Sequence, residues 1–309
     1  MRRTLPLLLA LVAAVAAPGC GLGEGEEQAG AGASLSVTRD FGRERLGEVD
    51  SEQVRENETV MRLLESRFDV EKRYGGRFVQ AIDGVEGRGA GGVADWFFFV
   101  NGVESEVGAA EYELSPGDHV QWDYRDWGAA MRVPAIVGAF PEPFLHGLEG
   151  ERRPVRVECD DSDSTACQAA RDTLEREGIS TSGSSLGAPG TETIFRLAVA
   201  RWPAARIVRG ASGLEDGPET TGVFVRFAED GRSFELLNVR GESVRTVRPG
   251  DGVGLILAMR PLAEEIVWLV TALDDAGLEA AVSSLDSGRL RDAFAVAVDG
   301  GEVERLPLP

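Results

Sequence analysis

The stretch Asp95–Gly102 reads DWFFFVNG, so four consecutive aromatic residues run directly into an Asn-Gly pair. Asn-Gly is the strongest two-residue signal for a β-hairpin, and the pattern predicts a strand over Trp96–Val100 that turns back at Asn101-Gly102. The whole chain is only 7% aromatic and carries a formal net charge of -20. We expect both faces of this strand to be covered, because leaving one large ring exposed forgoes about 4–6 kcal/mol.

The two faces of this strand carry different pairs of rings. Alternate side chains face opposite ways, which puts Trp96 and Phe98 on one face and Phe97 and Phe99 on the other. A predicted helix covers one face. The other face has two interpretations: it packs in a second core, or it forms one wall of a ligand groove. The indole N–H of tryptophan favours the face of Trp96 and Phe98 as the ligand side.

Residues 35–130 predict a small β-rich α+β domain around this strand. A helix with one apolar face begins near Asn57, which offers an N-cap. The turn Ser115–Asp118 leads into a strand over His119–Tyr124, in which apolar and polar side chains alternate. The apolar helix face consists of Val60, Leu63, Leu64 and Phe68, and further strands are expected over Leu35–Val37 and Arg77–Ile82.

Aromatic residues gather in this part of the chain. Three of the five tryptophans lie between positions 96 and 127, and such a cluster forms either the plain core of a small sheet or a flat platform for a ligand. On a platform, amide and hydroxyl side chains would supply the few polar contacts that orient a planar, partly apolar molecule. The candidate ligand-binding residues are Trp96, Phe98, Asn101, Tyr112, Gln121, Trp122 and Trp127.

The order of a helix, RFVQAIDGV, a glycine-rich loop, WFFFVNGV and GAAEYELSPGDHVQWDY resembles the transcobalamin-like C-terminal domain. That domain is found in vitamin B12 carriers and in many bacterial surface lipoproteins of unknown function. In the carriers it closes over the corrinoid, so the resemblance implies cobalamin, or a similar flat and partly apolar molecule, as the ligand. The resemblance rests on Trp96, Asn101-Gly102, Gly108-Ala109, Tyr112, Leu114, Gly117-Asp118, Val120 and Trp122.

After a Pro-rich linker over residues 131–153, residues 154–309 predict a mixed α/β domain. The order of its predicted elements differs from that of the first domain. Strands alternate with helices, and two strands are apolar throughout. A Ser/Gly loop is expected over Ser180–Gly190. Strands are expected over Val155–Cys159, Ile194–Val199, Gly252–Ala258 and Glu265–Leu273, with a helix from Thr165 to Gly178, a hairpin turning at Asp230-Gly231, and a helix capped by Asp274 or Asp275.

Cys159 and Cys167 are expected to form a disulfide between the end of a strand and the first turn of the next helix. A catalytic or metal site is the alternative, but the pair has no histidine partner nearby in sequence. Between the two cysteines lies DDSDS, Asp160–Ser164. Its alternate oxygen ligands suit a calcium loop, whereas acids and a serine directly before a helix are better explained as an N-cap.

Residues 1–20 read MRRTLPLLLALVAAVAAPGC and predict a signal peptide. The apolar run Leu5–Ala17 is shorter than the roughly 20 residues that cross a bilayer as a helix. The segment Ala17–Cys20 resembles a bacterial lipobox, in which the thiol of Cys20 takes a diacylglycerol. Ordinary cleavage after Ala14–Ala16 is the alternative. Residues 21–34, rich in Gly and Glu, predict a flexible tether.

The acidic charge argues against nucleic acid as a partner, because polyphosphate binding needs basic clusters. Neither histidine is flanked by a nucleophile motif, so we expect no catalytic residues, no metal site and no enzyme. A hydrolase with two converging carboxylates stays open, since sequence does not show which acids meet.

The predicted function is a ligand-binding lipoprotein anchored through its lipid to the outer face of the bacterial cytoplasmic membrane, with a membrane transporter as a partner. A non-catalytic structural or protein-interaction module of the cell envelope, in which every aromatic side chain is core, is the alternative.

Changing Cys20→Ser should release the protein from membranes, because it removes the thiol that would carry the lipid. Membrane fractionation after a salt wash measures the effect. A variant that stays in the membrane fraction at the level of the unchanged protein would place the anchor elsewhere.

Overall fold

The structure, a computed structural model, describes residues 32–74, 78–87, 93–189 and 193–309. The predicted signal peptide, Cys20 and most of the tether lie outside the described residues. Among the helices of the described residues, none combines the length and the apolar character that crossing a membrane requires.

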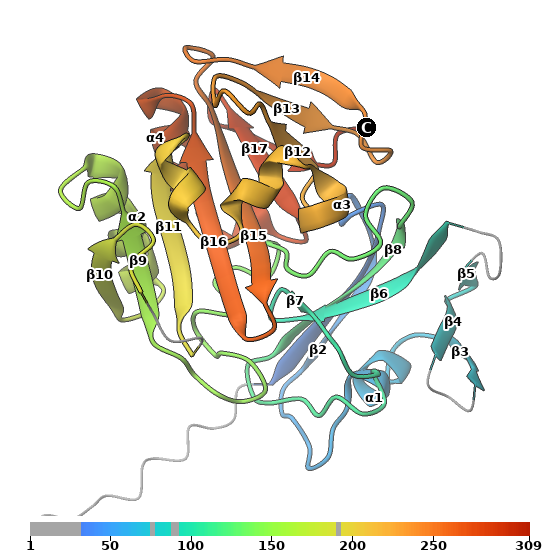
Figure 1. The fold of residues 1–309 in the computed structure, drawn as a ribbon. Coiled ribbons are helices and arrows are strands. Elements are labelled where there is room, and N and C mark those ends of the chain that lie inside the picture. Colours follow the sequence, from blue (N-terminus) through green and yellow to red (C-terminus); the bar gives the residue numbers. More distant parts are fainter. Residues whose placement is uncertain (1–31, 75–77, 88–92, 190–192) are drawn as a thin grey trace, which may run out of the picture.

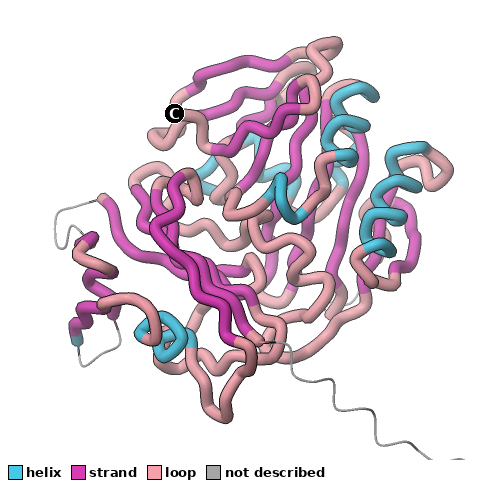
Figure 2. Tube along the Cα trace, turned by 180° about the vertical axis from the view of Figure 1, so that it is seen from behind, coloured by secondary structure: helices cyan, strands magenta, loops and turns pink. Residues whose placement is uncertain are grey.

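The described part of the chain is rich in β-structure and contains few helices (Figure 1). Its strands form a five-stranded sheet, a seven-stranded sheet and two three-stranded sheets. Seen from behind, the five-stranded sheet lies beside the seven-stranded one, and the small sheet β3-β4-β5 projects at the edge of the molecule (Figure 2).

The aromatic stretch forms strand β6, Ala94–Val100, inside the five-stranded sheet of order β2-β1-β8-β6-β7. It pairs antiparallel with β8, which in turn pairs parallel with β1. Asn101 and Gly102 both have positive φ, 51° and 77°, and connect β6 to β7, so the predicted hairpin is confirmed. The other strands of this sheet are β1 Ala33–Arg39, β2 Glu44–Ser51, β7 Val103–Glu104 and β8 His119–Asp126.

Helix α1, Val60–Glu65, covers one face of this sheet. The hydroxyl of Thr59 caps it by accepting a hydrogen bond from the amide of Arg62, so the helix begins two residues after the predicted Asn57 cap. Phe68 lies beyond the last turn and is still buried with the helix face. Beside the helix lie β3 Val70–Arg73, β4 Phe78–Ile82 and β5 Val85–Glu86.

The seven-stranded sheet has the order β10-β9-β11-β16-β15-β17-β18, with its first four strands parallel. Helices α2 and α4 pack on one face, and the sheet β12-β13-β14 packs on the other. The strands are β9 Val155–Cys159, β10 Thr181–Ser185, β11 Phe195–Arg201, β12 Val225–Phe227, β13 Phe234–Leu237, β14 Ser243–Val247, β15 Val253–Leu262, β16 Glu265–Ala272, β17 Ala295–Asp299 and β18 Glu302–Leu306; the helical segments are α2 Thr165–Arg176, η2 Ala204–Ile207, η3 Ala211–Glu215, α3 Pro218–Thr221, α4 Asp275–Ser283 and α5 Ser287–Leu290.

The N-caps and the cysteine pair that the sequence of residues 154–309 predicts are observed in the structure. Ser164 caps α2 and Asp274 caps α4, each accepting a backbone N–H, as expected for the N-cap interpretation of DDSDS. Cys159 and Cys167 form the disulfide. The loop expected over Ser180–Gly190 is wrong in part, because Thr181–Ser185 is the edge strand β10. Small polar side chains are tolerated there, since an edge strand gains its hydrogen bonds from one neighbour and exposes most side chains to water.

The rings of β6 are divided between two cores. Trp96 and Phe98 face α1, together with Trp122 of β8. Phe97 and Phe99 face the other way and pack against the core that contains β15, β16 and β17. The prediction that both faces are covered is correct. The face opposite the helix belongs to the phenylalanine pair, so assigning Trp96 and Phe98 to that side was wrong.

Residues 131–153, expected as a linker, pack between the two large sheets. Ile136 and Val137 are fully buried, and Phe140 is almost so. The amide of Ile136 donates to the carbonyl of Gly102, and the amide of Val137 donates to the carbonyl of Phe294. This segment thereby bonds the β6–β7 hairpin to the strand region that begins at β17.

Trp96→Ala and Phe99→Ala should each lower the free energy of unfolding by about 3–5 kcal/mol, because each removes a buried ring from a different core. Urea denaturation of the mature chain measures the loss. Tyr74→Ala is the matched control, since the Tyr74 side chain is 82% exposed and its removal should change little. A loss below about 1 kcal/mol for Phe99→Ala would mean that its face of the sheet is not a core.

Candidate functional site

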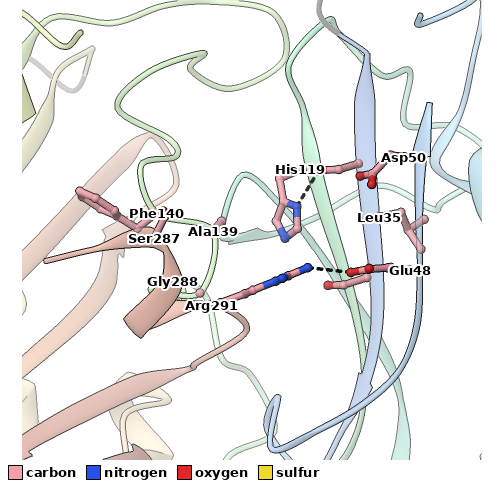
Figure 3. A pocket seen from close by; sticks show the side chains of 12 residues that line it. Leu35, Glu48, Asp50, His119, Ala139, Phe140, Ser287, Gly288 and Arg291 are labelled. Carbon is pink, nitrogen blue, oxygen red and sulfur yellow. Dashed lines mark hydrogen bonds and ion pairs between the residues drawn. The ribbon is translucent and has the colours of Figure 1, made fainter. Parts of the chain in front are cut away.

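A cleft of about 340 Å³ opens between the five-stranded sheet and the segment that follows α4 (Figure 3). Strands β1, β2 and β8 form one wall. The other wall consists of the backbone around Gly138–Phe140 and the beginning of α5. Gly138 packs so closely on Asp292 and Ala293 that an added Cβ would lie 2.6 Å from a backbone atom, so only glycine allows this approach of the two walls.

Three polar side chains stand in a row on the sheet wall. Ser34 of β1 pairs across the ladder with Asp50 of β2 on one side and with His119 of β8 on the other. Side chains at paired positions point to the same face, so the three reach the cleft together. Figure 3 shows Asp50 and His119 on this wall, with the imidazole ring extending into the space between the walls.

His119 is fixed at two points and keeps one ring nitrogen for the cleft. Its Nδ1 lies 2.8 Å from the hydroxyl of Ser34, and its backbone N–H donates to the side-chain oxygen of Asn101. No described residue hydrogen-bonds to its Nε2. Burial lowers the pKa of His119. The negative charge of Asp292 acts against this shift, and the positive charge of Arg45 adds to it. The ring is therefore neutral at pH 7 and offers either a donor or an acceptor.

An arginine from the opposite wall crosses the cleft. Arg291, directly after α5, donates to Glu48 of β2 at 2.6 Å, and its guanidinium lies beside the His119 ring (Figure 3). Arg45 pairs with both Glu48 and Asp292. These ion pairs tie the five-stranded sheet to the segment after α5, and Glu48 and Arg291 themselves line the cleft.

Beneath the cleft the same sheet face continues as a buried polar layer. Asp123 of β8 accepts hydrogen bonds from the hydroxyl of Thr38 at 2.6 Å and from the backbone N–H groups of Phe41 and Gly42. Burial nevertheless raises the pKa of Asp123 to about 6. Charged and polar groups are costly to bury unless they are bonded, so this layer fixes how the parts fit together.

Arg125 completes this layer at its apolar end. Its guanidinium lies 3.8 Å from the centre of the Phe97 ring and donates to the carbonyl of Ala130. Burial lowers the pKa of Arg125 to about 10, against the attraction of Glu104. The arginine is fully buried and still charged at neutral pH.

The aromatic side chains expected to contact a ligand lie mainly in the core. The indole N–H of Trp96 donates to the carbonyl of Val85, and Phe98 stacks on Trp122 with ring centres 4.9 Å apart. Trp96 and Trp122 are 5% and 3% exposed. Trp127 is partly exposed just beyond the end of β8. Trp96 and Trp122 therefore offer little surface to a ligand.

The side-chain amides of Asn101 and Gln121 donate to other groups of the protein, while the Oε1 of Gln121 is buried without a partner among the described residues. Asn101 is buried and donates to Asp118 and to the carbonyl of Gly147. Gln121 donates to the backbone carbonyl of Asp292 under the cleft. Tyr112 is buried with the helix core. None of the seven predicted residues is among those that line the cleft, and Gln121 contacts Asp292, the neighbour in sequence of the lining residue Arg291.

Sequence reasoning missed the residues that line the cleft. The alternation of HVQWDY identified a polar face at His119 but not what lies opposite it. Asp50 and Ser34 carried no motif, and Arg291 is separated from them by most of the chain. Within the described ranges, no group of three His, Cys, Asp or Glu side chains converges as a metal site would require.

Residues 57–126 match a family described as a domain of unknown function (DUF4430). The match covers the helix α1, the aromatic strand and β8, and it stops where the packed segment 131–153 begins. No curated protein matches the chain. A solved structure described as a "putative metal binding protein" from Ruminococcus gnavus is similar at 18% identity, over 31% of this chain and 97% of that one, with a TM-score of 0.26.

Asp123→Asn should change how stability depends on pH. The folded-state pKa of about 6 is higher than the ordinary unfolded value near 4, so the stabilisation is complete below about pH 4 and is lost as the pH rises through 6. Relative to the variant, the unchanged protein should lose about 2–3 kcal/mol of unfolding free energy between pH 4 and 7.5. Urea unfolding at both pH values tests this, with Asp172→Asn on α2 as the control. A difference that is independent of pH would contradict the shift.

Proposed function

We propose that this protein is a membrane-anchored, extracytoplasmic ligand-binding lipoprotein whose ligand occupies the cleft between the five-stranded sheet and α5. One observation carries the proposal: polar groups from strands β1, β2 and β8 converge in a cleft with the Nε2 of His119 unoccupied by any described residue. Ligand sites are typically preformed clefts with a few converging polar groups.

The export and anchoring of the protein rest on its N-terminus and its cysteines. The sequence of residues 1–20 has the pattern of a signal peptide that ends in a lipobox at Cys20. The disulfide between Cys159 and Cys167 suits an oxidising compartment outside the cytoplasm. The described chain begins two residues before Ser34, so the tether enters the fold beside the cleft. A lipid at Cys20 and a membrane transporter that receives the ligand complete the proposal.

The proposed architecture has two domains, the transcobalamin-like unit over residues 35–130 and the mixed α/β unit over residues 154–309. The cleft then lies at their junction, where ligand sites occur preferentially. Its volume of about 340 Å³ is at the small end of the roughly 300–1,000 Å³ range of ligand pockets. We therefore favour a ligand smaller and more polar than the corrinoid that the resemblance implies.

The second proposal is a non-catalytic structural or protein-interaction module. The burial of Trp96 and Trp122 favours it, because rings that were expected to form a ligand platform are used as core. Under this proposal the cleft is a surface feature without a ligand, and the two large sheets serve as a rigid spacer.

A thermal-shift screen of the mature chain, residues 21–309, against cobalamin and small polar metabolites distinguishes the two proposals. Ser287→Trp should abolish the shift, because Ser287 is exposed at the cleft wall and the indole would fill the space. Ser243→Trp, at an exposed position of β14, is the matched control and should retain it. Stabilisation that survives Ser287→Trp would place the site elsewhere, and the absence of any stabilising compound would favour the module.

A further inference from the structure

We infer that the cleft selects a small organic cation, with an ammonium or guanidinium group held by Asp50 and a further N–H or O–H donor bound by Nε2 of His119. This inference rests on the proposed ligand-binding role and specifies the class of ligand. It concerns one end of the cleft, the row formed by Asp50, Ser34 and His119.

The charges that line the cleft leave one carboxylate without a partner. Arg291 is paired with Glu48, and Arg45 with Glu48 and Asp292. Asp50, in contrast, forms no ion pair or hydrogen bond with any residue that the structure describes, although it lines the same cleft. Its negative charge is therefore available to a ligand, and a cation would complete the charge pattern.

The neighbouring histidine can serve the same ligand as an acceptor. A neutral imidazole carries one N–H and one lone pair. If its Nδ1–H donates to the hydroxyl of Ser34, the lone pair of Nε2 points into the cleft and accepts a hydrogen bond. The second donor group of the ligand would give its hydrogen to this lone pair, so binding stabilises this tautomer of His119.

The opposite wall suits the carbon part of such a molecule. Ala139 lines the cleft with its methyl group, across from the polar row. Neighbouring strands are about 4.8 Å apart, so Asp50 and His119, two strands apart, are separated by roughly 10 Å along the wall. A ligand that bonds both thus needs two donor groups joined by a short chain, as in a small diamine or an amino alcohol.

An anionic ligand is the competing possibility, and it would use Arg291. It would have to displace Glu48 from the guanidinium and would then face the uncompensated carboxylate of Asp50. Repulsion from Asp50 therefore disfavours an anion in the same space.

Isothermal titration calorimetry of the mature chain with 1,4-diaminobutane, ethanolamine, succinate and inorganic phosphate tests the inference. We expect the two amines to bind and the two anions not to. Asp50→Asn should weaken amine binding at least tenfold, because it removes the charge and keeps the shape. Asp172→Asn, the same change at an exposed position of α2, should leave binding unchanged. Thermal melts verify that both variants are folded, as expected for exposed carboxylates.

Three results would overturn the inference. The amines fail to bind, they bind Asp50→Asn as tightly as the unchanged protein, or an anion binds and is lost in Arg291→Ala. The last result would leave the ligand-binding role standing and change only the class of ligand. Failure of the role itself has a different signature, since no compound of the thermal-shift screen would then stabilise the protein. Binding that persists when Ser287→Trp fills the cleft would place the site elsewhere.

Discussion

The burial of strands β1, β6 and β8 of the five-stranded sheet on both faces is the constraint on which the rest of the structure depends. Its two faces have opposite chemistry. The face toward α1 is apolar, and the face toward the seven-stranded sheet is aromatic on β6 and polar on β8 and β1. An apolar face needs only contact to be stabilised, whereas a polar face must find a partner for each donor and acceptor. The apolar face includes Leu35, Val37, Val120 and Trp122, and the polar face includes Ser36, Thr38, Gln121 and Asp123.

The demand for partners explains why distant segments meet at this face. Asp292 reaches Ser36, Gln121 and Arg45, and the turn at Phe41 and Gly42 supplies two backbone donors to Asp123. Each of these bonds joins residues far apart in sequence, so the polar face specifies one arrangement of the chain. At the rim of the sheet, the carboxylate of Asp50 and the Nε2 of His119 have no hydrogen-bond partner among the described residues. The cleft forms at this place, and its unpaired groups are the continuation of the same polar face.

Much of the fold was predictable from local signals. The hairpin at Asn101-Gly102, the caps at Ser164 and Asp274 and the buried strands β15 and β16 follow from a few adjacent residues, and each is observed. Edge strand β10 was missed because its composition is that of a loop.

The sequence of β6 does not show which of its two faces packs against the helix, since both faces are aromatic. The answer depends on segments distant in sequence that pack on each face. The cleft was beyond sequence reasoning for the same reason. Asp50 and Arg291 become neighbours only through the pairing of β1 with β2 and the packing of the end of the chain on that sheet.

The double burial of β6 also bears on the flat ligand that the family resemblance implies. A planar molecule could use the rings of β6 only by replacing one of their covers. On one side it would displace α1 from Trp96 and Trp122, and on the other it would displace the core residues around Phe99. Exposing a core aromatic costs about 3–5 kcal/mol, and the ligand would have to recover this before any net binding appears. The polar cleft requires no such opening, because its walls already face solvent. A small ligand at Asp50 and His119 is thus compatible with the fold as it stands, whereas a corrinoid on β6 would require a different arrangement of the two large sheets.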